Sequence, residues 1–152
     1  MTRSRPVNRG YWILAVVAAF ILASTAGAYF AGIGPFARNQ LEQARQAASR
    51  RHTGAAVNLY LSHLDANPKD YAARLELGEL LKPIDASSAL QQLQEIPASA
   101  DEYPEAIWHI AHVATAGKRD ALAEDALQKL DEVRPNDAGV ALSLAELYYR
   151  TD

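Results

Sequence analysis

The stretch that decides the fold is NPKDYAARLELGELL (67–81), which returns further along the chain as RPNDAGVALSLAELY (134–148). In both copies a Pro-containing turn precedes a segment whose apolar residues recur every three or four positions, the spacing of one face of an α-helix. Pro135 follows Pro68 by 67 residues, which is two periods of about 34 residues. A period of this length predicts helical units stacked along the chain.

A third copy lies between these two, in IWHIAHVA (107–114). The small residue at the centre of each copy is Gly78, Ala111 or Ala145, and the steps between them are 33 and 34 residues. Helical periodicity continues through the rest of the body without an alternating β-branched run, so all-α is the fold class that fits. The predicted helices cover residues 36–50, 54–66, 69–82, 85–96, 102–116, 119–133 and 137–150, and Asp101 and Asp137 are the predicted N-caps.

The repeated pattern resembles the tetratricopeptide repeat (TPR), in which two antiparallel helices, A and B, carry small residues where they cross. The helix A core is matched by Leu77-Gly78-Leu81, Ile110-Ala111-Ala114 and Leu144-Ala145-Tyr148, the helix B crossing by Ala56 and Ala123, and the closing turn by Pro68 and Pro135. The resemblance covers roughly residues 37–152. It implies that residues 35–152 form an α-solenoid of about three TPR-like helical hairpins plus a final capping helix.

Several positions depart from the TPR pattern. Arg74 stands where a large apolar residue is usual, and the first unit has Gln40 and Gln43 in place of core residues. The second unit lacks the closing Asn-Pro. A related helical-repeat solenoid is therefore kept as an alternative fold, and a longer solenoid cut after helix A is an equal alternative to a capping final helix.

An apolar segment, residues 11–34, follows a basic tail, residues 1–10, which carries three Arg and no acidic residue. About 20 such residues cross the ~30 Å hydrocarbon core as a helix, so residues 11–34 are predicted to be a transmembrane helix. The tail favours a single-pass protein with a cytoplasmic N-terminus and a periplasmic or otherwise extracytoplasmic body. Arg residues between 38 and 51 oppose this orientation by the charge rule. A signal peptide cleaved after Ala26-Gly27-Ala28 is the alternative, and it places the body on the same side.

Small residues recur every four positions within the predicted transmembrane helix, at Ala15, Ala19, Ala23, Gly27 and Ala31. Such a stripe lets a second helix approach closely, so it predicts a packing face against a homodimer partner or another membrane subunit. Because nearly half of this segment consists of small residues, a chance alignment is the alternative reading.

Composition excludes several function classes. The chain has no Cys, so disulfides, Cys-ligated metal sites and thiol nucleophiles are impossible. From His52 onward eight basic residues face seventeen acidic ones, which argues against nucleic acid as a partner. No phosphate-binding loop or catalytic motif is present. We therefore predict a protein that is not an enzyme, takes no cofactor and has no small-molecule substrate.

The TPR resemblance also implies where partners would bind, because the A helices of that family line a concave face. The exposed helix A positions are Leu75, Glu76, Glu79, Glu105, Trp108, His109, His112, Leu142 and Glu146. Trp108 is the candidate anchor, since a large ring offers much contact area at low entropic cost. Packing of Trp108 between helices is the alternative. The Lys, Arg and Asn side chains with which one TPR subclass holds a C-terminal carboxylate are missing, so a basic or amphipathic segment is the expected ligand.

Glu105, His109 and His112 share one helix face at spacings of four and three residues. This spacing suits zinc or copper, but it also arises often by chance, and no metal is predicted. An imidazole beside a Glu is a candidate pH sensor as well.

The sequence as a whole predicts a membrane-anchored interaction module, an adaptor or assembly factor that contacts the lipid bilayer and a protein partner. The alternative is a constitutive accessory subunit of a respiratory, photosynthetic or secretory membrane complex, held through the small-residue stripe.

Overall fold

The computed structural model describes residues 35–151, and this part of the chain is all-helical, with no strand. Its helices are α2 (Pro35–Ser49), α3 (Thr53–Ala66), α4 (Tyr71–Leu81), α5 (Ala86–Gln94), α6 (Tyr103–Ala116), α7 (Asp120–Val133) and α8 (Ala138–Thr151). Their ends differ from the predicted ones by at most two residues. The all-α prediction is therefore confirmed for the described residues.

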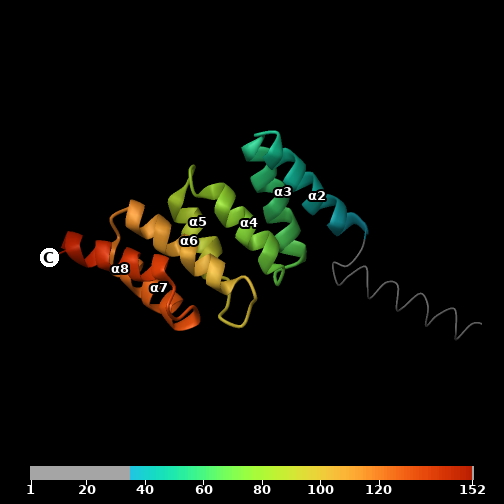
Figure 1. The fold of residues 1–152 in the computed structure, drawn as a ribbon. Coiled ribbons are helices and arrows are strands. Elements are labelled where there is room, and N and C mark those ends of the chain that lie inside the picture. Colours follow the sequence, from blue (N-terminus) through green and yellow to red (C-terminus); the bar gives the residue numbers. More distant parts are fainter. Residues whose placement is uncertain (1–34, 152) are drawn as a thin grey trace, which may run out of the picture.

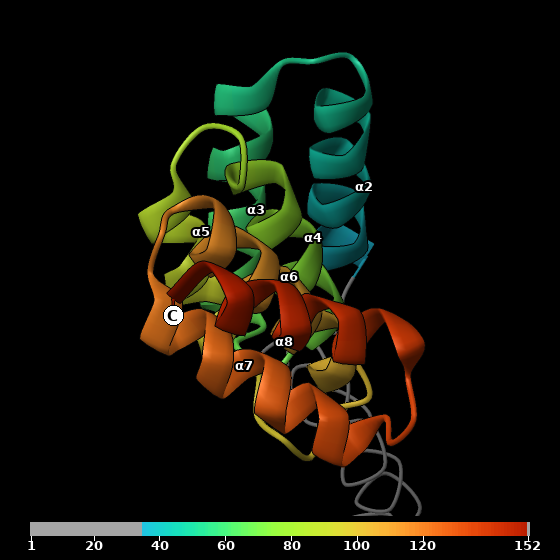
Figure 2. The same ribbon diagram turned by 60° about the vertical axis from the view of Figure 1, so that its left-hand side comes forward.

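The helices form three antiparallel hairpins, α2–α3, α4–α5 and α6–α7, followed by α8 alone. Each hairpin stacks on the next, so the chain advances in one direction from α2 to α8 (Figure 1). The turned view shows α8 lying along α7 (Figure 2). This is the predicted arrangement of three hairpins and a final helix.

The two helices of a hairpin approach closely because the crossing positions are small. A Cβ added to Gly78 on α4 would lie 2.7 Å from Cδ2 of the buried Leu93 on α5. Ala111 on α6 and Ala123 on α7 are buried in the same way. Leu93 can fill the space above Gly78 only because that position has no side chain.

Polar side chains start several helices. Asp70 accepts a hydrogen bond from the Ala73 N–H (3.0 Å) at the start of α4. At the start of α5, Asp85 accepts hydrogen bonds from the Ser87 and Ser88 N–H groups. The predicted cap Asp137 accepts from the Gly139 N–H (2.8 Å), as expected. The prediction that Asp101 is an N-cap is wrong. Helix α6 begins at Tyr103, its N-cap position is Glu102, and a Pro lies in its first turn.

The apolar core divides into two clusters of buried residues that meet at α4. The smaller cluster joins α2, α3 and α4 with the start of α5, and includes Tyr60, Leu77 and Leu81. The larger cluster runs from α5 to α8 and takes in Leu75 of α4. Because α4 lies in the middle of the stack, it buries apolar residues against helices on both sides.

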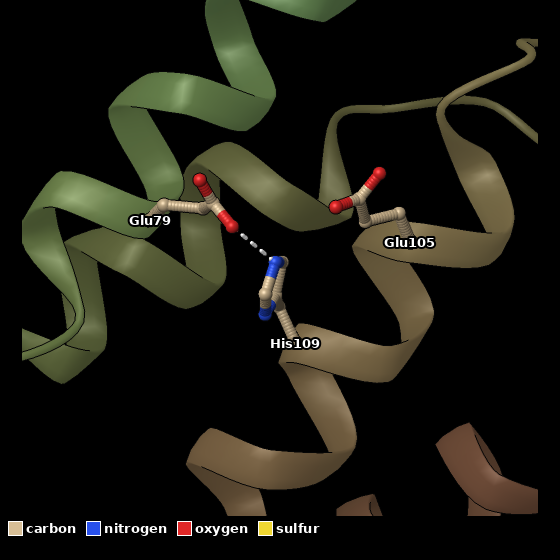
Figure 3. A group of neighbouring side chains, drawn as sticks. All are labelled: Glu79, Glu105 and His109. Carbon is tan, nitrogen blue, oxygen red and sulfur yellow. Dashed lines mark ion pairs between the residues drawn. The ribbon is translucent and has the colours of Figure 1, made fainter.

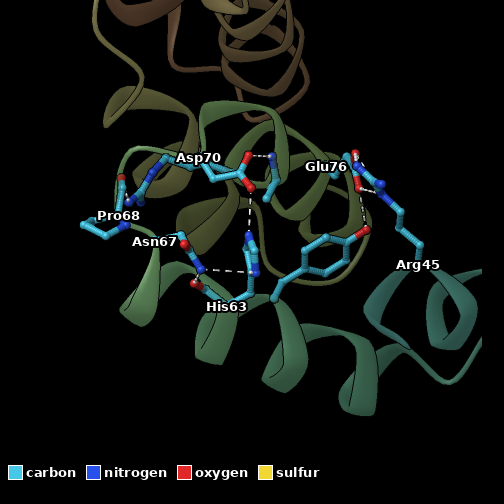
Figure 4. A network of polar contacts seen from close by, with 9 residues as sticks. Arg45, His63, Asn67, Pro68, Asp70 and Glu76 are labelled. Atoms are coloured by element: carbon cyan, nitrogen blue, oxygen red, sulfur yellow. Dashed lines mark hydrogen bonds and ion pairs between the residues drawn. The ribbon is translucent and has the colours of Figure 1, made fainter. Parts of the chain in front are cut away.

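A polar network joins the first hairpin to α4 (Figure 4). The Arg45 guanidinium of α2 donates to the Glu76 carboxylate (2.6 Å), which also accepts from the Tyr60 hydroxyl of α3 (2.7 Å). Burial raises the pKa of Glu76, but the hydrogen bonds from Arg45 and Tyr60 outweigh it, so this pKa lies below its ordinary value. The junction is therefore an ordered, charged contact.

The same junction holds a buried imidazole. His63 Nε2 lies 2.7 Å from the Asp70 carboxylate, and Asn67 donates to the His63 carbonyl (3.0 Å). Burial raises the pKa of Asp70, but the hydrogen bonds from His63 and the Ala73 N–H outweigh it, so this pKa lies below its ordinary value. Asp70 thus starts α4 and ties it to α3.

Arg74 explains its own departure from the TPR pattern. Its guanidinium lies in a largely buried position and pairs with Glu95. It also donates to Gln92 (3.0 Å) and to the Pro68 carbonyl (3.2 Å). These acceptors stabilise the two terminal nitrogens of the guanidinium, whereas its buried Nε has no hydrogen-bond partner among the described residues.

Within residues 35–151 no helix has the length and apolar character needed to cross a membrane. The predicted tail (1–10), the predicted transmembrane helix (11–34) and its small-residue stripe all lie outside the described residues.

Candidate functional site

A hollow of about 480 Å³ opens between α6 and α8, with α7 beneath it. It lies between consecutive A helices, where the sequence predicted a binding surface. The residues that line the hollow are Trp108, Ala111, His112, Thr115, Ala116, Leu127, Ser143, Glu146, Leu147 and Arg150.

The floor of the hollow is apolar and its rim is polar. Leu127 and Leu147 are buried beneath it, whereas the Trp108 ring stands in its wall with 38% of its surface exposed. Glu146 on α8 is exposed at the rim, and Arg150 pairs with Asp120 of α7. An apolar side chain of a partner would find matching surface in the hollow and a charged group beside it.

A second hollow of about 530 Å³ adjoins the first at the ends of α4 and α6. It shares His112 and Ala116 with the first hollow and adds Lys82, Pro83 and Val113. We call the two hollows together the groove. The groove therefore extends across three successive A helices, α4, α6 and α8.

A polar cluster of Glu79, Glu105 and His109 lies where α4 faces α6 (Figure 3). His109 Nε2 is 2.6 Å from Glu79 Oε1, and His109 Nδ1 is 2.8 Å from the Lys82 ammonium. Because an ammonium can only donate, Nδ1 accepts from Lys82 and the ring proton is on Nε2, which lies near Glu79 but not in hydrogen-bond geometry to it. The contacts form a chain from Lys82 through His109 to Glu79.

Burial lowers the pKa of His109, and the Lys82 charge lowers it further, while Glu79 raises it. The net direction is downward, so the neutral imidazole that fits this chain of contacts is also the favoured form. His109 thereby holds α4 and α6 together without carrying a charge.

Donor atoms of Glu79, Glu105 and His109 lie within 4.8 Å of one another, a spacing that a divalent cation could use. This set differs from the one considered on sequence, because His112 lies on the wall of the hollow instead. The Lys82 ammonium, in contact with the imidazole, opposes a second cation there. The cluster is better explained as a contact between two A helices.

Replacing Lys82 with Met is expected to raise the pKa of His109, because one of the two influences that lower it is a neighbouring positive charge. Glu79→Gln is expected to lower the pKa further, because it removes the negative charge that raises it. NMR titration of the His109 ring carbons and nitrogens measures both shifts. Shifts of the opposite sign would show that these side chains do not contact the imidazole as described.

Eight of the nine predicted groove residues fall into four groups in the structure. Trp108, His112 and Glu146 line the hollow, and Glu79, Glu105 and His109 form the polar cluster. Leu142 is 61% exposed but lies outside both hollows. Glu76 binds Arg45 and Tyr60 at the junction with the first hairpin.

Leu75 and His109 were predicted to be exposed, and this is wrong, because each is only 9% exposed. Leu75 packs in the larger core cluster, and His109 lies in the polar cluster between α4 and α6. The burial of Leu75 follows from the position of α4 between two hairpins, which cover both sides of this short helix. Whether the remaining predicted residues contact a partner stays a prediction.

Among the polar residues that line the groove, sequence reasoning missed Lys82, Thr115, Ser143 and Arg150. Lys82 follows Glu79 by three positions and Arg150 follows Glu146 by four, so each lies on the same helix face as a residue that was selected. Extending each predicted face by one turn would have found both.

Neither the family models nor the curated proteins compared with the sequence give a match. Solved structures do resemble the fold. The crystal structure of MamA matches 76% of this chain and 63% of its own length, with a TM-score of 0.67 and 18% identity. The chain thus spans less than two thirds of MamA. The first TPR of Spaghetti (RPAP3), bound to the HSP90 peptide SRMEEVD, matches 76% of this chain and 92% of its own, with a TM-score of 0.65 and 15% identity.

At these identities the likeness concerns the fold alone. The described residues form three stacked hairpins with small residues at their crossings, followed by a lone final helix. Two TPR-containing structural neighbours agree with this arrangement. The described part of the chain has a tetratricopeptide-repeat-like fold.

Proposed function

We propose that this protein is a membrane-anchored adaptor or assembly factor that binds a segment of a partner protein in the groove. The observation that carries the proposal is the hollow between α6 and α8, with its buried apolar floor and half-exposed Trp108. The proposal gives the groove a binding role and no catalytic one.

The structural neighbour RPAP3 supports binding of a peptide by a fold of this kind, because its TPR is bound to an HSP90 peptide. That peptide, SRMEEVD, is acidic towards its end. In the present chain Glu146 lines the groove, and Glu79 and Glu105 lie beside it in the polar cluster between α4 and α6. The partner proposed here therefore differs in charge from that peptide.

The membrane part of the proposal rests on the sequence of residues 1–34. A basic tail before an apolar segment of spanning length favours a cytoplasmic N-terminus and a body on the extracytoplasmic side. An adaptor held there would present its groove to segments of other membrane or extracytoplasmic proteins.

Site-specific photo-cross-linking in living cells tests the binding role. A photoreactive amino acid placed at His112 or Glu146, both on the hollow, is expected to cross-link the same partner. Trp108→Ala is expected to reduce both cross-links about tenfold or more, because it removes an anchor ring. Placing the reagent at Leu61, an exposed residue of the B helix α3, is the control.

Cross-links of equal strength at 61 and 112, insensitive to Trp108→Ala, would contradict groove binding. Since the chain lacks Cys, single Cys residues test its orientation separately. Thr2→Cys and Ser99→Cys should react differently with a membrane-impermeant maleimide, with only the second labelled from the extracytoplasmic side. Labelling of Thr2→Cys instead would reverse the proposed orientation.

The small-residue stripe favours the second candidate, a constitutive subunit of a membrane complex. Ala19→Leu with Gly27→Leu is expected to release such a subunit from its complex while the groove stays intact. Sizing in mild detergent distinguishes the two candidates, because an adaptor would keep its partner after this change and lose it after Trp108→Ala.

A further inference from the structure

The charges around the hollow are unevenly compensated. Glu146 at the rim and Glu105, one turn before Trp108 on α6, make no ion pair with any residue between 35 and 151. Both are exposed. The acidic side chains beside the hollow are therefore available to a cation from outside.

The positive charges of the groove are already engaged. Arg150 pairs with Asp120, and the Lys82 ammonium contacts His109 Nδ1 at 2.8 Å. An anionic ligand would have to break these contacts and would meet two carboxylates. A cationic ligand would meet Glu146 with no ion-pair partner among the described residues, and at Glu105 it would share the site with the Lys82 charge near His109.

The hollow itself suits a bulky apolar side chain. Ala111, Leu127 and Leu147 form a buried floor, and the Trp108 ring offers both an apolar wall and a face that attracts cations. Glu105 lies about one helical turn from Trp108, or 5–6 Å between Cβ atoms. The Glu105 carboxylate is thus close enough to attract a cationic ligand residue next to the one whose side chain is in the hollow.

Resting on the proposed function, we infer that the groove selects a protein segment in which a bulky apolar side chain is flanked by Lys or Arg. The apolar side chain enters the hollow between α6 and α8. The flanking cations lie against Glu105 and Glu146. This selectivity is opposite in charge to that expected for an acidic peptide.

Fluorescence anisotropy with short labelled peptides tests the selectivity, using the full-length chain in non-ionic detergent. The basic peptide has a Lys-Leu-Phe-Lys core in a Gly/Ser frame. The acidic peptide has Glu at both Lys positions, and the third peptide has Ala at the Leu and Phe positions. The basic peptide is expected to bind at least about tenfold more tightly than either of the others. The acidic peptide loses two charge pairs, and the Ala-containing peptide loses the apolar contact.

Charge-reversal variants locate the selectivity. Glu146→Lys and Glu105→Lys are each expected to reduce the preference for the basic over the acidic peptide several-fold, and the double variant is expected to reverse it. Glu132→Lys on α7 is the matched control, since it makes the same change at an exposed site outside both hollows and outside the polar cluster of Glu79, Glu105 and His109. It should leave the order of the peptides unchanged. Added salt should weaken the preference of the wild-type chain.

The outcomes separate this inference from the function on which it rests. Equal binding of the basic and acidic peptides, or an order unaffected by Glu105→Lys and Glu146→Lys, overturns the charge selectivity and leaves groove binding standing. Failure to bind any of the peptides, while cross-links form at position 112, likewise overturns the inference. Loss of the cross-links as well overturns the proposed function.

Discussion

Gly78→Val is expected to destabilise the protein by about 3 kcal/mol, the upper range for forcing extra volume into a packed core. A Cβ at this position would lie 2.7 Å from Leu93 Cδ2 and 2.8 Å from Leu93 Cγ. Leu93 is buried and belongs to the larger core cluster, so it cannot swing aside into solvent. Urea unfolding followed by circular dichroism, on the full-length chain in non-ionic detergent, measures the change.

Two further variants identify the cause of the loss. Gly54→Val is the matched control, because a Cβ at Gly54 of α3 meets nothing within 4 Å, and it should change stability by less than about 0.5 kcal/mol. Combining Gly78→Val with Leu93→Ala should cost at least about 1 kcal/mol less than the sum of the two single changes. An additive result would mean that the two side chains do not meet at the α4–α5 crossing.

Glu76→Ala is expected to cost about 2 kcal/mol and to loosen the first hairpin from α4. The substitution leaves the buried Tyr60 hydroxyl without its acceptor, and an unsatisfied buried hydroxyl costs about 1–3 kcal/mol. Loss of the Arg45 contact adds little, because the Arg45 side chain is 46% exposed and screened by water. Amide hydrogen exchange should rise in α2 and α3 and change little in α6 and α7.

The same junction makes the first hairpin acid-sensitive. The pKa values of Glu76 and Asp70 are both below their ordinary values in the folded chain. Each group therefore binds fewer protons when folded than when unfolded, and its contribution to stability is complete above its unfolded pKa and is lost as the pH falls through the lowered folded value. Loss of α2–α3 protection should begin below about pH 4.

Tyr60→Phe combined with Glu76→Ala provides the comparison for both effects. Removing the hydroxyl and its acceptor together should recover part of the stability that Glu76→Ala loses, because no buried polar group is then left unsatisfied. Equal stability of the single and double variants would contradict the hydrogen bond between them. In the double variant the acid-induced loss of α2–α3 protection should depend on Asp70 alone.

The helices and their order were predictable because the deciding signals are local. Apolar spacing of three and four residues, Pro-containing turns and the recurrence of Gly78, Ala111 and Ala145 all depend on residues close in sequence. The start of α6 was misplaced because Asp101 and Glu102 are both acidic residues in a long turn, and only the backbone path decides which one comes before the helix.

Contacts between helices were harder to predict. Arg45 and Glu76 are 31 residues apart and lie on different helices, so their pairing depends on the angle between hairpins. Leu75 was misplaced for a related reason, since the TPR pattern assigns its position to the open face, whereas here the neighbouring hairpin covers it. Trp108, His112 and Glu146 line one hollow because they lie on faces of α6 and α8 that the repeat brings side by side.

The division of the core at α4 has a consequence for how the molecule comes apart. Leu77 and Leu81 of α4 belong to one buried cluster and Leu75 to the other. In a solenoid whose units contact only their neighbours, stability is a sum of unit and nearest-neighbour energies. The hairpin α2–α3 can then open as a separate cooperative unit at a lower free energy than the rest, with α4 remaining folded on α5 as the new end of the stack. The groove across α4, α6 and α8 would survive that opening, so a bound partner would remain in place while the first hairpin is open.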